Sequence, residues 1–295
     1  MDISLERPTV VVIAGPTAAG KSGVALGLAR RLGGTIINAD ASQVYADLRI
    51  LSARPSAADE AAVPHRLYGV IDGADTCDAA RWAVMARAEI TAAIAAGSVP
   101  IVTGGSGMYL RTLLDGIAPV PPIDPEVRAE VRALDPATAR AALAALDPAA
   151  AARIADPQRV ARALEVVRSS GRRLSEWQAA ATGGLAAEAD VRGQVVDLPR
   201  PDLHARIDAR LDAMLAAGAL DEVAALDRCE LPADAAVMKA LGVPPLLAHL
   251  RGEIDLATAI ERTRLDTRHY AKRQQTWFRN QTRDWPRTGA GDIGL

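Results

Sequence analysis

The chain has 295 residues, of which 49% are hydrophobic, and this length suits one large domain or one domain that carries an insert. Its formal net charge of -2 at pH 7 excludes a globally basic nucleic-acid binder but not a local basic patch. Aromatic residues make up only 3% while Ala and Leu are abundant, so helices are expected to outnumber strands.

Cysteine usage and apolar runs exclude further classes. Cys77 and Cys229 stand far apart without His or Cys at metal-ligand spacing, which argues against a disulfide framework or a zinc site. The N-terminal stretch lacks the basic region and long apolar core of a secretory signal, and no later run approaches the roughly 20 apolar residues that span a bilayer. We expect a cytoplasmic protein without a membrane partner.

The first predicted strand is "TVVVIA" at residues 9–14, and it leads into "GPTAAGKS" at 15–22 and a helical stretch. The octapeptide fits G-x-x-x-x-G-K-[ST], a loop that surrounds a diphosphate or triphosphate. Gly15 and Gly20 permit the turns, Lys21 brings positive charge, and Ser22 can ligate Mg²⁺. Backbone amides recognise the anion and not what is attached to it, so the loop leaves the ligand open.

Two more β-branched runs follow, "TIINAD" at 35–40 and "VPIVTGG" at 99–105, with the helical stretch "AARWAVMARAEITAAIAAG" before the second. Alternating strands and helices predict an α/β, P-loop NTPase-like fold, a parallel sheet with helices on both faces. Ligands bind beyond the carboxyl ends of such strands. The stretches "GPTAAGKS", "DASQVY" and "GGSGMY" are therefore expected to line one crevice.

Candidate chemical groups stand at these strand ends. Asp40 can bind Mg²⁺, orient a nucleophile or accept a proton, or it can cap the turn after its strand. Gln43 and Tyr45 can hydrogen-bond to or stack on a base, although a tyrosine such as Tyr45 is more often a core residue. Ser106 brings a hydroxyl to the third strand end, where the alternative is a plain strand-to-helix turn.

Prolines cluster near "DGIAPVPPIDPEVR", and residues 124–180 then predict successive amphipathic helices separated by Asp-Pro turns. The segment "VRGQVVDLPR" predicts a return to the sheet, and a long helix follows. We therefore predict a catalytic core of residues 1–117 and 191–295 with an all-helical insertion domain at 118–190. On one insert helix, "DPQRVARALEV" at 156–166, composition alone favours a solvated face over a nucleic-acid contact.

The stretch at 261–287, "ERTRLDTRHYAKRQQTWFRNQTRDWPR", is locally basic although the net charge of the chain is -2. Cations with interleaved aromatics are typical of surfaces that bind phosphate backbones and unstacked bases. The cations and aromatics are Arg262, Arg264, Arg268, Lys272, Arg273, Arg279, Arg283 and Arg287 with Tyr270, Trp277, Phe278 and Trp285.

With these stretches assembled, the chain resembles the bacterial tRNA dimethylallyltransferases, or tRNA isopentenyltransferases, from about Val10 to Trp285. The matching stretches include "GPTAAGKS", "INADASQVY", "VTGGSGMYLRTLLDGI", "DPQRVARALEV", "RIDARLDAMLAAGALDEV" and "RHYAKRQQTWFRNQ". The resemblance implies transfer of a dimethylallyl group from dimethylallyl diphosphate to N6 of the adenine just 3′ of the tRNA anticodon. Mg²⁺ is the implied cofactor, a monomer is expected, and DNA is not an expected partner.

The resemblance also implies residue roles. Asp40 is the general base, and Ser106 helps to place it or the substrate. Diphosphate contacts fall on Gly15, Pro16, Thr17, Ala18, Ala19, Gly20, Lys21, Ser22, Arg206 and Arg210. Contacts with the tRNA, whose adenine must leave its stack to react, fall on Asp40, Ala41, Ser42, Gln43, Arg128, Gln158, Arg159, Val160, Ala161 and Arg162.

Three positions depart from the family pattern. Ala41 stands where Ser is more usual, Ser106 stands where Thr is more usual, and "LGVPP" at 241–245 replaces the usual "IGYKE". The last change leaves a tRNA contact from Lys239 to Pro244 unsupported. Ser106 and the Gly-Val-Pro of "LGVPP" are similar instead to the adenylate isopentenyltransferases of cytokinin synthesis, which prenylate free AMP, ADP or ATP.

The alternatives are separated by what each would need. The helical insert and the basic stretch have no evident use with a free nucleotide, whereas an RNA hairpin needs an extended cationic surface. A small-molecule kinase, suggested by the phosphate loop alone, would need an acceptor site and a lid. A non-catalytic RNA-binding module would leave Asp40 and the phosphate loop without a purpose in one crevice.

Overall fold

The computed structural model describes residues 7–289 and divides into two compact units. The core unit comprises Met1–Leu113 with Leu185–Leu295, and the insert unit comprises Leu114–Gly184. The insert boundaries predicted from sequence, 118 and 190, each lie a few residues later in the chain. The end differs because a 3₁₀ helix at Leu185–Ala187 buries Leu185 and contacts the strand that follows it in the core unit.

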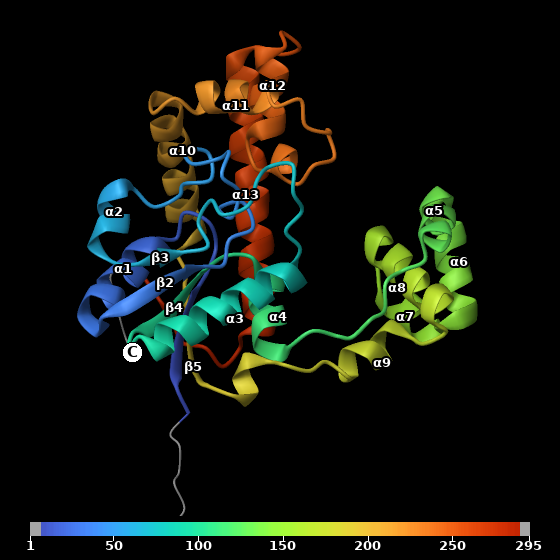
Figure 1. Cartoon of the computed structure of the whole chain (residues 1–295). Helices are drawn as coiled ribbons and strands as arrows, with labels where there is room; N and C mark the ends of the chain where they lie inside the picture. The colour runs from blue at the N-terminus through green and yellow to red at the C-terminus, as the bar shows by residue number, and fades with distance from the viewer. Residues whose placement is uncertain (1–6, 290–295) are drawn as a thin grey trace, which may run out of the picture. The chain divides into compact units, whose positions relative to one another are not determined.

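Six parallel strands form the sheet in the order β3-β2-β4-β1-β5-β6 (Figure 1). The four strands predicted from the β-branched runs are present, and the two that were not predicted are two-residue strands at the sheet edges. Two residues are too few to show a periodic pattern. The strands are β1 (Thr9–Ala14), β2 (Gly34–Asn38), β3 (His65–Arg66), β4 (Val99–Gly104), β5 (Asp190–Val196) and β6 (Arg287–Thr288).

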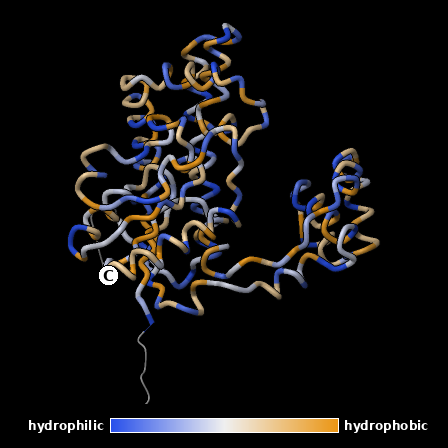
Figure 2. Tube along the Cα trace, in the orientation of Figure 1, coloured by the Kyte–Doolittle hydropathy of each residue, from blue (hydrophilic) through white to orange (hydrophobic). Residues whose placement is uncertain are grey.

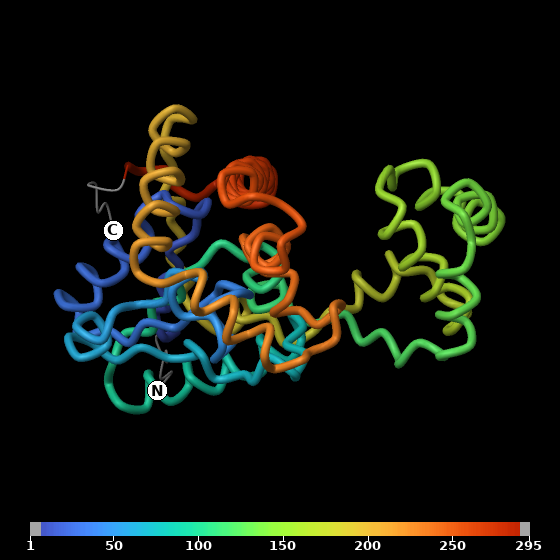
Figure 3. Tube along the Cα trace, turned by 90° about the horizontal axis from the view of Figure 1, so that it is seen from above, coloured from blue at the N-terminus to red at the C-terminus, as the bar shows by residue number. Residues whose placement is uncertain are grey.

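Helices cover both faces of this sheet, so the predicted α/β fold class is confirmed. Val11 and Ile13 of β1 pack in one hydrophobic cluster with α1 (Lys21–Leu32), α10 (Arg200–Ala216) and α13 (Leu256–Gln281). The buried Val10 and Val12 alternate with them and point to the other face, where α3 (Ala79–Ala95) contacts β2 and β4. Figure 3 shows α3 on the opposite side of the sheet from α10 and α13.

Helices outnumber strands in the core unit, as the composition predicted. Hydrophobic residues concentrate along the central strands, while hydrophilic residues gather on loops and outer helix faces (Figure 2). Within residues 7–289 no helix combines the length and apolar character needed to cross a membrane. The remaining helices of this unit are α2 (Ala57–Ala62), α4 (Gly107–Asp115, which runs on into the insert unit), α11 (Ala219–Asp227), α12 (Val243–Leu250) and a 3₁₀ turn at Val237–Lys239.

The insert unit is all helical, and its Asp-Pro pairs define where helices begin. In each of four helices the Asp side chain accepts a hydrogen bond from a first-turn N–H while Pro occupies the first turn. Buried alanine, valine and leucine residues of these helices form the unit's own hydrophobic core. The helices are α5 (Pro125–Ala133), α6 (Pro136–Leu146), α7 (Pro148–Arg153), α8 (Pro157–Ser170) and α9 (Leu174–Ala179).

Candidate active site

The loop at residues 15–22 connects β1 to α1 through a backbone that depends on glycine. Gly15 has a φ of 146°, and a Cβ there would collide with the carbonyl oxygen of Val196 at the end of β5. Gly20, with a φ of 102°, is the N-cap of α1 and supplies no side-chain hydrogen bond. The first-turn N–H groups of α1 therefore remain available to bind an anion at the carboxyl edge of the sheet.

Three cations converge on this loop. Lys21 Nζ donates to Pro16 O at 2.7 Å, Arg206 Nη1 donates to Ala19 O at 3.3 Å, and Arg210 Nη2 donates to Thr17 Oγ1 at 2.6 Å. Burial lowers the pKa of Lys21 to about 8, although the Asp40 carboxylate opposes this shift. The two arginines come from α10, far away in sequence, and only the family resemblance pointed to them.

Asp40 follows β2 and is held by its own neighbours. Its Oδ1 accepts from the backbone N–H of Ser42 at 2.9 Å, and its backbone N–H donates to Asn38 Oδ1 at 2.8 Å. Ser106, after β4, accepts the Ala41 N–H on its Oγ at 2.8 Å and donates its own N–H to Ala39 O at 3.1 Å. The two strand ends are thus bonded together, and the Asp40 carboxylate keeps one oxygen without a hydrogen-bond donor among these groups.

Tyr270 of α13 completes this side of the site. Burial raises the pKa of its phenol, the Asp40 carboxylate raises it further, and a hydrogen bond with Ser106 lowers it in part. The phenol is therefore neutral at physiological pH. Nothing in the spacing of the basic stretch distinguished Tyr270 from its aromatic neighbours, so sequence reasoning did not assign it to the crevice.

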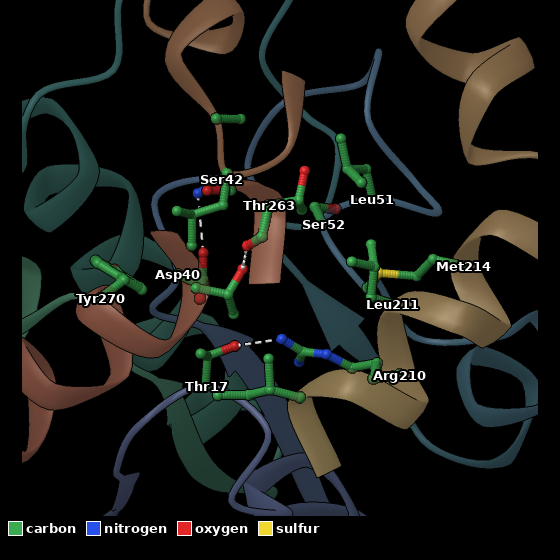
Figure 4. A pocket seen from close by; sticks show the side chains of 14 residues that line it. Thr17, Asp40, Ser42, Leu51, Ser52, Arg210, Leu211, Met214, Thr263 and Tyr270 are labelled. Atoms are coloured by element: carbon green, nitrogen blue, oxygen red, sulfur yellow. Dashed lines mark hydrogen bonds between the residues drawn. The ribbon is translucent and has the colours of Figure 1, made fainter. Parts of the chain in front are cut away.

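A cavity in the core unit is lined by several of these groups, and its walls are of two kinds (Figure 4). The polar wall carries Thr17, Asp40, Ser42, Arg210 and Tyr270, together with Ser52, Thr263 and Thr267. The apolar wall consists of Leu51, Ile207, Leu211, Met214, Ala240 and Leu241. In Figure 4, Leu51, Leu211 and Met214 gather on one side and Asp40 and Tyr270 lie on the other, while the hydrogen-bonded pair of Thr17 and Arg210 lies below both groups. An anionic head with an apolar tail matches this division.

The apolar wall was not predicted, although part of it carries a readable signal. Ile207, Arg210, Leu211 and Met214 stand at i, i+3, i+4 and i+7, which places them on one face of α10. Leu241 begins the departing "LGVPP" stretch, in which Gly242 is the αL N-cap of α12 and both prolines lie in its first turns. This stretch therefore contributes a cavity wall and a helix start.

Gln43 and Tyr45, which follow Asp40 in the sequence, form hydrogen bonds with later segments of the chain. Gln43 Nε2 donates to the carbonyls of Ser52 and Ala53, both at 2.9 Å, so its amide nitrogen holds a loop. Tyr45 is 3% exposed, and its hydroxyl accepts from Cys77 N. The core interpretation of Tyr45 is therefore correct.

The stretch at 261–287 contains paired cations, packed aromatics and exposed cations. Arg264 and Arg268 form ion pairs with Asp212 and Asp208 of α10, at 2.7 and 2.6 Å, and these pairs join α13 to α10. Phe278 is fully buried, Trp277 packs over Gly107, and Trp285 packs over Gly193. These three aromatics serve packing, so the expectation that they stack on bases is wrong for Phe278 and unsupported for the tryptophans. The cations exposed on α13 are Arg262, Lys272, Arg273 and Arg279.

The insert unit presents its predicted residues differently. Arg128 of α5 and Gln158, Arg159 and Arg162 of α8 are exposed. Val160 is 1% exposed and packs in the insert core, because it faces inward on the amphipathic α8. We therefore withdraw the Val160 side chain from the candidate RNA-contacting set.

Comparison with known proteins places the chain in a family. The sequence profile described as IPP transferase matches residues 43–281. The tRNA dimethylallyltransferase of Rhodospirillum rubrum is 54% identical over 280 residues, which cover 93% of this chain and 86% of that protein. The tRNA dimethylallyltransferase of Sphingopyxis alaskensis is 55% identical over 282 residues, which cover 94% and 92%.

Solved structures agree in fold. A eukaryotic dimethylallyltransferase that acts on tRNA superposes with a TM-score of 0.84 at 27% identity, over 97% of this chain and 74% of that one. The tRNA isopentenylpyrophosphate transferase of Bacillus halodurans gives a TM-score of 0.69 at 29% identity, over 98% and 92%. The α/β fold is P-loop-like, and the relatives are transferases. The chain belongs to the IPP transferase family and is a prenyltransferase.

Proposed function

We propose that this protein transfers the dimethylallyl group of dimethylallyl diphosphate to N6 of the adenine 3′-adjacent to the anticodon of tRNA. The observation that carries the proposal is a cavity in which Thr17 of the phosphate loop, the Asp40 carboxylate and an apolar wall meet. The relatives named tRNA dimethylallyltransferase match nearly the whole chain at 50% identity or more, which supports the same reaction here.

One set of residues stabilises the leaving diphosphate, and Asp40 acts on the attacking amine. The C1–O bond of the donor breaks, and the electron pair leaves with the diphosphate, whose developing charge is stabilised by Lys21, Arg210 and the amides of α1. N6 forms the new bond to C1. Because the N6 lone pair is delocalised into the ring, the amine needs a base, and the Asp40 carboxylate accepts its proton. Ser106 fixes the backbone that carries Asp40.

Mg²⁺ fits this site as an ion shared with the substrate. Among residues 7–289 no three His, Cys, Asp or Glu side chains form a cluster that could hold a metal. Mg²⁺ often takes only one or two protein oxygens and completes its octahedron with phosphate oxygens and water. The exposed Ser22 hydroxyl in the first turn of α1 is suited to be such a ligand, and the bound ion would neutralise charge on the diphosphate.

RNA is the proposed acceptor because the chain carries cationic surface beyond what a nucleotide needs. Arg128, Arg159 and Arg162 are exposed on the insert together with the neutral Gln158, and α13 exposes four further cations in the core unit. Phosphate contacts by such side chains would position an anticodon stem-loop. We propose that the enzyme acts as a monomer in the cytoplasm, where tRNA is found.

The experiment offers radiolabelled dimethylallyl diphosphate and Mg²⁺ to the protein with either an anticodon stem-loop or AMP. Label that moves to the stem-loop and not to AMP is the expected result. Label on AMP alone would instead support an adenylate isopentenyltransferase. Phosphoryl transfer from ATP, measured in parallel, would support the kinase alternative, and RNA binding without any transfer would support a non-catalytic module.

A further inference from the structure

The apolar wall of the cavity lies at a defined distance from the phosphate loop. Arg210 of α10 contacts Thr17 of the loop, and Met214 stands four residues later on the same helix face. Since an α-helix rises 1.5 Å per residue, Met214 lies roughly one turn, about 6 Å, beyond the diphosphate anchor along α10. An extended isoprene unit has a comparable length. A donor anchored at Arg210 therefore brings the end of its first isoprene unit to Met214.

The far end of this wall is closed by two segments that pack on each other. A Cβ on Gly242, the residue after Leu241, would lie 3.0 Å from Leu51 Cδ1 and 3.2 Å from Thr263 Cγ2. Ordinary Cβ contacts are longer, so Leu51 packs tightly against the backbone at Gly242. The Leu51 segment and the segment that carries Leu241 and Gly242 are therefore in contact at this point of the cavity wall.

The Leu51 segment is also held in place. Both carboxylate oxygens of Glu222 on α11 accept backbone N–H groups, from Arg49 at 2.6 Å, Ile50 at 2.8 Å and Leu51 at 2.8 Å. Three hydrogen bonds to one carboxylate fix the backbone more firmly than neutral bonds would. Leu51 is 8% exposed and forms a wall that does not yield easily to a larger ligand.

We propose that Met214, with Leu51 and Leu241, ends the prenyl subsite and restricts the donor to a five-carbon chain. The inference rests on the proposed function, because it takes the cavity as the donor site. Met214 is the residue to change, since it is only half-buried and unbranched, so its truncation removes wall without breaking a hydrogen bond.

The test compares dimethylallyl diphosphate with geranyl diphosphate, which is one isoprene unit longer, as donors to the anticodon stem-loop, with products weighed by mass spectrometry. The wild-type protein is expected to use the shorter donor almost alone. Met214→Ala should raise the ratio of kcat/KM for geranyl to dimethylallyl diphosphate at least tenfold. An unchanged ratio in a folded Met214→Ala protein overturns the proposal.

Met85→Ala is the matched control, because Met85 is also a half-buried helical methionine but lies on α3 outside the cavity. Its donor ratio should equal that of the wild type. Leu241→Ala opens the same end from another element and should reproduce the change, which keeps the test decisive should Met214→Ala fail to fold. Met214→Phe should raise KM for dimethylallyl diphosphate without altering inhibition by inorganic diphosphate, and an unaltered KM would contradict the proposal.

Failure of the proposed function would look different. A wild-type protein that prenylates AMP and never RNA refutes the acceptor, yet its donor ratio can still be measured on AMP. Transfer of dimethylallyl groups to RNA with no donor discrimination in any variant refutes only the chain-length inference.

Discussion

The backbone N–H of Thr17 in the phosphate loop donates to Gln274 Oε1 of α13 at 2.8 Å, across 257 residues of sequence. The other end of the same amide donates to Gly105 O at 2.9 Å, in the loop after β4. Gln274 is 4% exposed, and its bond to Gly105 is buried while its bond to Thr17 is partly buried. One buried side chain thus ties the phosphate loop to the strand end that carries Ser106.

Replacing Gln274 by Leu should lower both stability and affinity for the donor. Each buried amide or carbonyl that loses its partner costs about 1–3 kcal/mol, so urea unfolding should show a loss of at least about 2 kcal/mol. The freed phosphate loop should raise KM for dimethylallyl diphosphate about tenfold. Gln275→Leu removes bonds to Asp197 and Leu198 instead. It should lower stability without the change in KM, and equal KM effects in the two variants would contradict this role.

Asp40→Asn should lower kcat by roughly 10²–10⁴-fold, the range that general-base catalysis usually contributes. The Asn Oδ1 can still accept the Ser42 N–H, so the local fold and the donor KM should change little. Single-turnover transfer to the stem-loop measures the chemical step, and circular dichroism checks the fold. Wild-type turnover by this variant would remove Asp40 from the role of base.

The sequence predicted the loop side of the cavity better than its apolar wall, for a physical reason. Amide cradles need glycine, lysine and a hydroxyl at fixed spacing, so residues 15–22 are readable in one window. The resemblance added Arg206 and Arg210. The apolar wall has no such constraint, because Leu51, Met214 and Leu241 satisfy it from three separate segments.

The strands and insert helices show a similar limit. Long β-branched runs and Asp-Pro caps carry local signals, and the structure places β1, β2, β4 and β5 at the predicted runs. The two-residue strands β3 and β6 exist only because neighbouring strands pair with them. Tertiary packing also determines which aromatic residues are exposed, since the full burial of Phe278 cannot be read from the composition of the stretch.

Donor binding should weaken above pH 8. Burial lowers the pKa of Lys21 from its ordinary 10.5 to about 8, so the ammonium that attracts the diphosphate is lost in the free enzyme as pH rises through that value. Affinity for a non-reacting dimethylallyl diphosphate analogue should fall by up to about tenfold per pH unit beyond it. Calorimetric titration from pH 6.5 to 9.5 measures this. Lys21→Met should bind weakly throughout and show no inflection near pH 8.

The same shift has an opposite consequence for stability. Between about pH 8 and 10.5 the unfolded chain holds a proton on Lys21 that the folded chain has released. The free energy of unfolding therefore increases as pH rises across that window, because the folded protein no longer buries a charged Lys21. This contribution is lost again as the pH falls to 8. Lys21→Met removes the contribution, so the difference in unfolding free energy between wild type and variant should vary with pH across this window. A constant difference would contradict the lowered pKa.

The cations of α13 should separate into two groups when tRNA binding is measured against salt. Lys272 and Arg279 are exposed without an ion pair among the described residues, whereas Arg264 is paired with Asp212. Each phosphate contact removed should lower the slope of log affinity against log salt by about one. Lys272→Ala combined with Arg279→Ala should therefore reduce the slope by up to about two.

Arg264→Ala is the matched comparison on the same helix. Asp212 of α10 neutralises the charge of Arg264, so the salt slope of tRNA binding should keep its wild-type value. Loss of this ion pair should loosen α10, which carries Arg210, and should therefore raise the donor KM. Filter binding of the anticodon stem-loop at several salt concentrations distinguishes the groups. An equal loss of slope in Arg264→Ala and in the double variant would show that pairing within the protein does not decide which cations reach RNA.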